Sequence, residues 1–226
     1  MGFIKSEMKK KAIIISIKGY HLSTKEQRLI ADEKPWGLIL FKRNIKSFNQ
    51  IIRLVKNIRK CSKDPKFPIL IDEEGNTVSR LSEIINHNFS QKFIGDIYKY
   101  NSKFALSIYE HYIDNLTSIL KKIGININTV PVLDVIRKQT NKIIGKRSFS
   151  NDPYIVKQLG DICVKKYRLN KVGTVIKHIP GHGCSSLDSH LKTPKVKLSV
   201  KDLNKIDFSP FKANSSQFAM TAHILY

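Results

Sequence analysis

Residues 152–183 have the sequence DPYIVKQLGDICVKKYRLNKVGTVIKHIPGHG, and this stretch shows the pattern that decides the fold. Asp152 predicts a helix N-cap, and Pro153 fits the first helical position because an N–H is not needed there. The run Val172–His178 is apolar and rich in β-branched residues until its polar end, which is typical of a buried strand. A proline and two glycines then exclude a helix and predict a loop over 179–183.

The same alternation of strand and helix recurs along the rest of the chain. Five further apolar runs predict strands, namely Ala12–Ile17, Gly37–Phe41, Pro68–Asp72, Ile127–Val135 and Phe218–Ile224. Because these runs are apolar throughout instead of alternating, they predict strands that are buried on both faces. Several of them end in polar or charged residues, as the strands of an enzyme do where they reach its active site.

Helical patterns fill the intervals between these strands. Ser23 with Glu26 and Ser47 with Gln50 each predict a capping box at a helix start. An apolar stripe over 104–123 predicts a long helix. Repeated strand–helix units predict an α/β fold with a parallel sheet.

Two architectures fit this α/β pattern. A (β/α)8 barrel and an open doubly wound sheet both place ligands at strand C-termini. The sequence contains neither GxGxxG nor GxxxxGK[ST], which argues against an open sheet that binds nucleotides. The six predicted strands fall short of the eight that close a barrel.

The composition fits a folded globular protein. Of 226 residues 41% are hydrophobic, and the mean hydropathy is -0.25, which allows one sizeable core. No apolar run reaches the roughly 20 residues that span a bilayer, and the run at 12–17 is too short for a signal peptide. Three cysteines far apart form no CxxC pair and favour a reducing compartment. We therefore expect one cytoplasmic domain over residues 1–226 that has no membrane partner.

The charge is strongly positive, because 40 Lys and Arg face 18 Asp and Glu and give a net charge of +22. Such a balance fits a nucleic-acid partner or an acidic membrane surface. The lysines are spread along the whole chain, however, with no long block and no interleaved aromatic residues. We therefore expect a solvated lysine surface and no nucleic-acid partner. The alternative hypothesis, a nucleic-acid-associated protein, predicts an affinity that falls steeply with salt.

The densest group of titratable residues lies just past the predicted strand at 172–178. Within fourteen positions the chain has Lys177, His178, His182, Asp188 and His190. Histidine titrates near neutral pH and suits general acid/base catalysis. A carboxylate two positions away can orient an imidazole, so Asp188 and His190 form a candidate catalytic pair.

Two other interpretations of this loop stay open. A metal-dependent hydrolase would use His178, His182, Asp188 and His190 as ligands, although the spacing is not HExxH and no cysteine pair assists. In the second, the histidines are simply solvated and the glycines and proline only make turns.

Two further stretches carry candidate residues. Asp72, Glu73 and Glu74 follow the predicted strand at 68–72 and could act as acid/base groups, metal ligands or acceptors for sugar hydroxyls. A solvated turn is the alternative for them. Arg147 lies in a polar loop before the helix start at Asp152, and alone it is an ordinary surface arginine.

These residues carry a resemblance to a known family. KHIPGHG at 177–183 with DSH at 188–190 resembles the KH[FI]PGHG…DSH signature of bacterial β-N-acetylhexosaminidases of glycoside hydrolase family 3. Other stretches resemble that family in the same order, namely GLILF at 37–41 with Arg43-Asn44, DEEG at 72–75, PVLDV at 131–135, IGKRSF at 144–149 and MTAH at 220–223. The resemblance covers nearly the whole chain.

The resemblance implies a (β/α)8 barrel that removes terminal, non-reducing N-acetyl-β-D-glucosamine from peptidoglycan fragments during cell-wall recycling. It implies a retaining mechanism in the cytoplasm, a carbohydrate substrate, a monomer if complete, and neither a metal nor an organic cofactor. By similarity, His190 is the general acid/base with Asp188 as its partner. The residues expected to bind the sugar are Asp72, Arg80, Arg147, Lys177 and His178.

The sequence also departs from the family. The family's nucleophile is an aspartate on the strand after MTAH, whereas this sequence stops at Tyr226. We therefore expect an incomplete barrel, truncated at its C-terminus with about six of eight strands, that does not hydrolyse its substrate alone. Glu73, Asn76 and Thr77 replace the family's Gln, Gly and Arg. A non-catalytic, sugar-binding remnant of the fold is the alternative.

Overall fold

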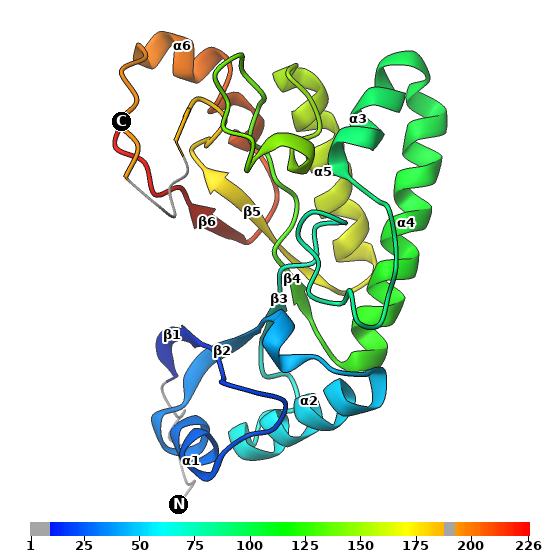
Figure 1. The fold of residues 1–226 in the computed structure, drawn as a ribbon, viewed down its shortest axis with the longest axis vertical. Helices are drawn as coiled ribbons and strands as arrows, with labels where there is room; N and C mark the ends of the chain where they lie inside the picture. The colour runs from blue at the N-terminus through cyan, green and yellow to red at the C-terminus, as the bar shows by residue number, and fades with distance from the viewer. Residues whose placement is uncertain (1–9, 188–192) are drawn as a thin grey trace, which may run out of the picture.

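The computed structural model describes residues 10–187 and 193–226, which form an α/β structure (Figure 1). Within these residues six parallel strands follow one another across a single sheet in chain order. Their bounds are β1 Lys11–Ile15, β2 Pro35–Leu40, β3 Ile69–Ile71, β4 Ile127–Asn128, β5 Gly173–Ile179 and β6 Phe218–Thr221. Each neighbouring pair is joined by a crossover, as parallel strands require.

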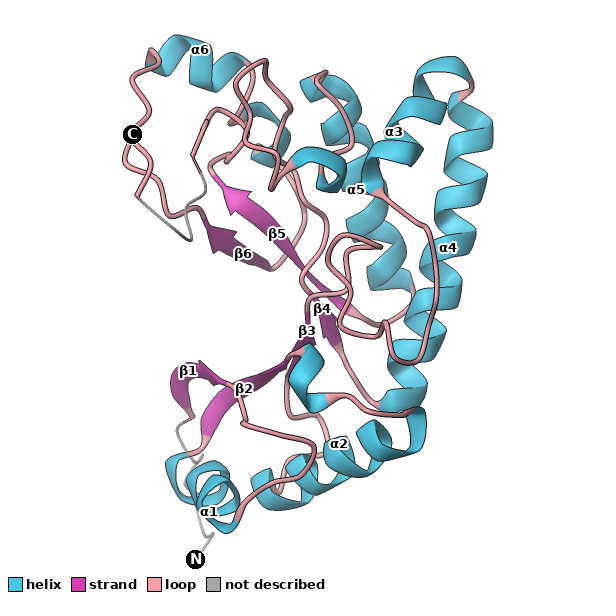
Figure 2. Cartoon of the chain, in the orientation of Figure 1, coloured by secondary structure: helices cyan, strands magenta, loops and turns pink. Residues whose placement is uncertain are grey.

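Helices lie on the outer side of this sheet (Figure 2). The α-helices among the described residues are α1 Thr24–Glu33, α2 Phe48–Ser62, α3 Gln91–Tyr100, α4 Ser102–Ile123, α5 Pro153–Leu169 and α6 Val200–Lys205. Short 3-10 helices are η1 Lys42–Asn44, η2 Gly145–Arg147 and η3 Ser209–Phe211. The main core fills the space between sheet and helices, and its largest fully buried side chains include Tyr167, Phe67 and Phe149.

The sheet curls instead of lying flat. In Figure 1 the pair β1–β2 and the pair β5–β6 face each other, with β3 and β4 between them at the back of the curve. On the inner side a second cluster gathers around Leu70, Ile127 and Val175. Trp36 of β2 meets Phe218 of β6 edge to face, with ring centroids 5.3 Å apart. The predicted α/β architecture, an incomplete (β/α)8 barrel, is therefore confirmed as a curled half-barrel.

The prediction that every strand is buried on both faces is wrong for the two edges of the sheet. β2, β3 and β4 have mostly buried residues, and so does the centre of β5. In β1, however, Ile13 and Ile14 are 52% and 44% exposed, and β6 alternates between exposed and partly buried residues. A parallel strand is covered on both faces only where neighbouring elements flank it, and β1 and β6 each pair with one strand here.

The predicted helix starts are largely confirmed. Ser23 forms a complete capping box with Glu26. Ser47 accepts a hydrogen bond from the Gln50 N–H as predicted, but the Gln50 side chain accepts from the N–H of Lys46 and not of Ser47. Asp152 caps α5 by accepting from the N–H of Tyr154. The sequence patterns missed α3, a helix of ten residues that directly precedes α4.

Among residues 10–187 and 193–226, no helix has the length and apolar character that crossing a membrane requires.

Candidate functional site

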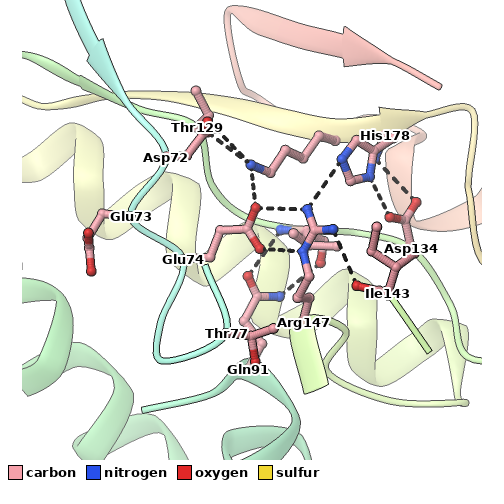
Figure 3. A network of polar contacts seen from close by, with 12 residues as sticks. Asp72, Glu73, Glu74, Thr77, Gln91, Thr129, Asp134, Ile143, Arg147 and His178 are labelled. Carbon is pink, nitrogen blue, oxygen red and sulfur yellow. Dashed lines mark hydrogen bonds and ion pairs between the residues drawn. The ribbon is translucent and has the colours of Figure 1, made fainter. Parts of the chain in front are cut away.

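Polar side chains from several strands meet at the carboxyl ends of β3, β4 and β5 (Figure 3). Asp72 and Glu74 follow β3, Thr129 follows β4, and Lys177 lies near the end of β5. Parallel strands end at the same edge of a sheet, so residues that are far apart in sequence come together here. Glu73 lies between two of these residues and points away from them, because alternate residues of an extended chain face opposite sides.

Lys177 is the buried centre of this cluster. Its Nζ lies 2.5 Å from a carboxylate oxygen of Glu74 and 3.3 Å from one of Asp72, and it donates to the Thr129 hydroxyl at 2.9 Å. Thr129 in turn donates to Asp72. The lysine is only 2% exposed, so all three of its N–H groups find partners inside the protein, as a buried ammonium requires.

Arg147 forms a two-pronged ion pair with the same glutamate. Its Nε and Nη2 donate to the two Glu74 oxygens at 2.7 and 2.9 Å, a geometry that only a planar guanidinium offers. The η2 turn that carries Arg147 packs against α3. Glu74 therefore binds two cations, one from the sheet and one from a loop.

His178 lies beside Arg147 at the end of β5. Its Nδ1 is 2.7 Å from the carboxylate of Asp134, and its Nε2 is 3.5 Å from Nη2 of Arg147. Asp134 is fully buried and comes from the segment after β4. The imidazole is thus fixed between a carboxylate and a guanidinium (Figure 3).

Arg80 completes the group from the loop between β3 and α3. Its Nη2 lies 3.3 Å from Asp72, and its guanidinium carbon lies 5.8 Å from the centre of the Phe41 ring. Glu73 anchors this loop, because its buried carboxylate accepts hydrogen bonds from the backbone N–H of Arg80 at 2.7 Å and of Leu81 at 2.9 Å. His87 also contacts Glu73, at 3.1 Å.

These side chains surround a pocket of about 370 Å³. Its walls include five predicted residues, Asp72, Arg80, Arg147, Lys177 and His178. Met220 of β6 also lines it, and a smaller cavity of about 150 Å³ adjoins it along 220–223. The pocket combines an apolar side chain with charged groups of both signs, a mixture suited to a polar ligand with hydroxyl groups.

The electrostatics of the cluster favour the ionised forms of Asp72, Glu74 and Arg147. Burial acts to raise the pKa of Asp72, but the charge of Lys177 and the hydrogen bond from Thr129 outweigh it and the pKa is lowered. Burial is likewise outweighed at Glu74, where Lys177 and Arg147 lower the pKa. For Arg147, burial lowers the pKa, yet the bonds to Glu74 prevail and raise it.

The structure brings the five predicted sugar-binding residues together. The predicted catalytic pair, Asp188 and His190, lies outside the described residues. Sequence reasoning assigned no specific role to Glu74, Thr129, Asp134 or Met220. One sequence feature could have indicated Glu74 and Asp134, because each is a carboxylate at or near the end of an apolar run. Thr129 had no such feature, because a threonine within such a run is ordinary.

The metal hypothesis stays untested at two of its four ligands, Asp188 and His190. Within 10–187 and 193–226, no three His, Cys, Asp or Glu side chains gather as they would around a metal ion. His178 instead contacts Asp134 and Arg147, and a nearby guanidinium disfavours a cation at its Nε2.

Comparison with known proteins places this chain in a family. Residues 7–226 match the glycosyl hydrolase family 3 N-terminal domain. The chain belongs to glycosyl hydrolase family 3. Its relatives include beta-hexosaminidase A of Pseudoalteromonas piscicida, 34% identical over 84% of this chain and 33% of that protein. The beta-hexosaminidase of Stenotrophomonas maltophilia strain R551-3 is 30% identical over 95% of this chain and 64% of that protein.

Solved family 3 structures agree with the fold. The crystal structure of NagZ from Neisseria gonorrhoeae in complex with N-trifluoroacetyl-D-glucosamine superposes with a TM-score of 0.87 at 27% identity. That match covers 96% of this chain and 64% of the NagZ chain. The chain therefore spans less than two thirds of the length of these relatives.

Proposed function

We propose that this chain supplies the sugar-binding pocket of a β-N-acetylhexosaminidase that hydrolyses terminal, non-reducing N-acetyl-β-D-glucosamine. The observation that carries the proposal is the set of charged groups around one pocket, whose lining residues include Asp72, Lys177 and His178. Ionised carboxylates accept from sugar hydroxyls, and Lys and Arg donate to hydroxyl and acetamide oxygens, through charge-assisted hydrogen bonds. The names of the relatives and the glucosamine derivative bound to NagZ support this choice of sugar.

The proposed chemistry is a retaining hydrolysis in two steps. In the first step a nucleophile attacks the anomeric carbon while an acid protonates the leaving oxygen, and in the second step water releases the sugar. His190 is the proposed acid and base, oriented by Asp188, because an imidazolium can protonate a leaving oxygen near neutral pH. The proposed nucleophile is an aspartate on the strand after 220–223, which residues 1–226 do not contain.

The compartment, the source of the substrate and the oligomeric state are proposed from the same resemblance. We propose a cytoplasmic protein that acts on peptidoglycan fragments in cell-wall recycling and works as a monomer when its barrel is complete. Hydrolysis by residues 1–226 alone is not expected, since the proposed nucleophile is missing from them. Non-catalytic sugar binding is the second candidate function for residues 1–226. It is favoured because the six described strands and their loops already form the pocket.

Calorimetric titration of the 226-residue protein with N-acetylglucosamine tests the binding function. Saturable binding is expected, and Asp72→Asn should weaken it at least tenfold because a charged acceptor is lost. Asp161→Asn is the control, since Asp161 lies on the half-exposed face of α5, pairs with Lys157 and accepts from Asn214, away from the pocket lining. If no saturation is seen, or if both variants bind as the wild type does, the sugar-binding proposal is wrong.

Turnover of a chromogenic N-acetyl-β-glucosaminide tests the catalytic part. No release of the chromophore is expected from residues 1–226, and release is expected when the downstream strand with its aspartate is restored. A clear rate from the shorter protein that disappears in His190→Ala would contradict the assignment of the nucleophile.

A further inference from the structure

Asp134 makes more contacts with the site than its place in the sequence indicates. One of its oxygens, Oδ2, lies 2.7 Å from the His178 Nδ1. The other, Oδ1, accepts two backbone N–H groups, from His178 at 3.2 Å and from His182 at 2.6 Å. The carboxylate is completely buried, so these three donors take the place of water around it.

The first of these contacts selects one form of the histidine. An ionised carboxylate only accepts hydrogen bonds, so the ring nitrogen that faces Asp134 carries a proton. On the other side of the ring, Nε2 faces the guanidinium of Arg147, which only donates. Both neighbours therefore favour the arrangement with a proton on Nδ1 and with the Nε2 lone pair facing Arg147 in the wall of the pocket.

The other two contacts anchor the chain that leaves the strand. His182 is the fourth residue after His178, and both residues have their backbone N–H on the same carboxylate oxygen. The turn is held from a second side as well, because the Thr140 hydroxyl donates to the carbonyl of Gly183 at 2.5 Å. Gly183 packs closely on the backbone of Val135. A Cβ added to Gly183 would lie 1.8 Å from the carbonyl oxygen of Val135.

The ionised state of Asp134 fits this role. Burial acts to raise the pKa of the carboxyl, but the electrostatic attraction of the His178 Nδ1–H and the backbone hydrogen bonds from His182 and His178 outweigh it, and the pKa is lowered. Among the described residues, the other charged or titratable groups with a contact to the His178 ring include Arg147, at 3.5 Å, and His182, whose ring centroid lies 5.8 Å away. Asp134 is thus the acceptor for both the ring and the turn.

We propose that Asp134 is a positioning residue that couples the sugar pocket to the loop after β5, in which His182 lies. Through Nδ1 it holds His178 in the tautomer whose Nε2 accepts from Arg147, so that both residues keep their places in the wall of the sugar pocket. Through the His182 N–H it fixes the start of the segment that leads towards residues 188–190. The effect on sugar binding rests on the function proposed above, whereas the effects on tautomer and turn do not.

Nitrogen-15 NMR of the histidine rings in the 226-residue protein tests the tautomer directly. In the wild type at mildly alkaline pH, His178 is expected to show a protonated Nδ1 and an unprotonated Nε2. Asp134→Asn replaces one acceptor oxygen by a donor, so it should give a mixed or reversed tautomer. It should also speed hydrogen exchange of the His182 amide about tenfold or more.

Asp207→Asn is the matched control. Asp207 is an equally buried carboxylate near the same turn, but it pairs with Arg137 and makes no contact with His178. Loss of Asp207 should lower stability and leave the His178 tautomer unchanged. If both variants shift the tautomer equally, a general loosening explains the result and the positioning role is wrong.

The remaining outcomes are decisive too. An unchanged tautomer and unchanged His182 exchange in Asp134→Asn would overturn the proposal. Should that variant not fold, the wild type decides alone, because a protonated Nε2 in His178 contradicts the proposal. If the tautomer shifts while neither protein binds N-acetylglucosamine, the positioning role stands and the sugar-binding function fails. If both hold, the affinity of Asp134→Asn for the sugar should be about tenfold weaker.

Discussion

At the scale of single residues, Lys177 explains why two carboxylates can stay buried side by side. Asp72 and Glu74 are 8% and 4% exposed, and each would be costly to bury as an isolated ion. Lys177 lies between them and Arg147 closes the other side of Glu74. Such a network adds little stability as a whole, yet removing one member leaves the others unpaired.

Lys177→Met should therefore be strongly destabilising. We expect a loss of about 3–5 kcal/mol in the free energy of unfolding, because two buried carboxylates lose their shared cation. Chemical denaturation followed by circular dichroism measures it. Lys157→Met is the control, since its ion pair with Asp161 lies on the exposed surface and contributes about 0.3–0.5 kcal/mol. Equal losses in the two variants would contradict the buried network.

The pH dependence of stability should reflect the same residues. Asp72, Glu74 and Asp134 all have pKa values lowered in the fold, although burial alone would raise them. A lowered folded pKa stabilises the protein above the unfolded value of about 4, and that contribution disappears as the pH falls through the folded value.

We therefore expect the free energy of unfolding to decrease as the pH falls below about 4, and to decrease less steeply in Glu74→Gln, which lacks one such group. Denaturation at a series of pH values measures both slopes. Glu110→Gln changes an exposed carboxylate on α4 and serves as the control. A wild-type stability that does not change on acidification would refute this prediction.

At the scale of elements, the contact between α3 and the turn before α5 positions Arg147. Gly95 of α3 lies against the backbone of Phe149, and an added Cβ would lie 1.8 Å from the Phe149 carbonyl oxygen. Phe149 is two residues after Arg147. This close approach is possible because glycine has no side chain, so the helix can pack directly onto the turn.

Gly95→Ala should displace the turn and weaken both fold and site. Overpacking of this kind costs about 1–3 kcal/mol or more, and a displaced Arg147 should reduce the affinity for N-acetylglucosamine. Thermal unfolding and calorimetric titration measure the two effects. Gly19→Ala is the control, because an added Cβ at Gly19 meets nothing within 4 Å. Full affinity in Gly95→Ala would show that α3 does not position the arginine.

At the scale of the whole molecule, aromatic side chains link strands at opposite ends of the sheet. Trp36 of β2 and Phe218 of β6 belong to the inner cluster and contact each other although three strands separate them in the sheet order. Edge-to-face pairs contribute about 0.5–1.5 kcal/mol beyond the area that they bury. The contact helps to hold the curl of the half-barrel.

A double-mutant cycle on Trp36→Phe and Phe218→Leu should give a coupling energy of about 0.5–1.5 kcal/mol. Trp36 is the one tryptophan in the sequence, so its fluorescence in Phe218→Leu reports the same contact directly. A shifted emission maximum is expected on loss of the neighbouring ring. A coupling energy near zero with unchanged emission would show that the two strands do not interact in solution.

The sequence alone determined the order of the strands, most of the helices and five of the residues that line the pocket. Apolar runs, helix caps and the loop after β5 depend on neighbouring residues, so they can be recognised locally. The resemblance then pointed to Asp72, Arg80, Arg147, Lys177 and His178, and these five do line one pocket. The roles of Asp188 and His190 stay predictions.

Only the tertiary structure decided which partners those residues have. Whether a strand is covered depends on its neighbours in the sheet, and for that reason the exposure of β1 and β6 could not be derived from their apolar runs. The contacts of Glu74 with Arg147 and of Asp134 with His178 join residues 73 and 44 positions apart. No local pattern encodes such contacts, because they arise where strand ends converge at one edge of the curled sheet.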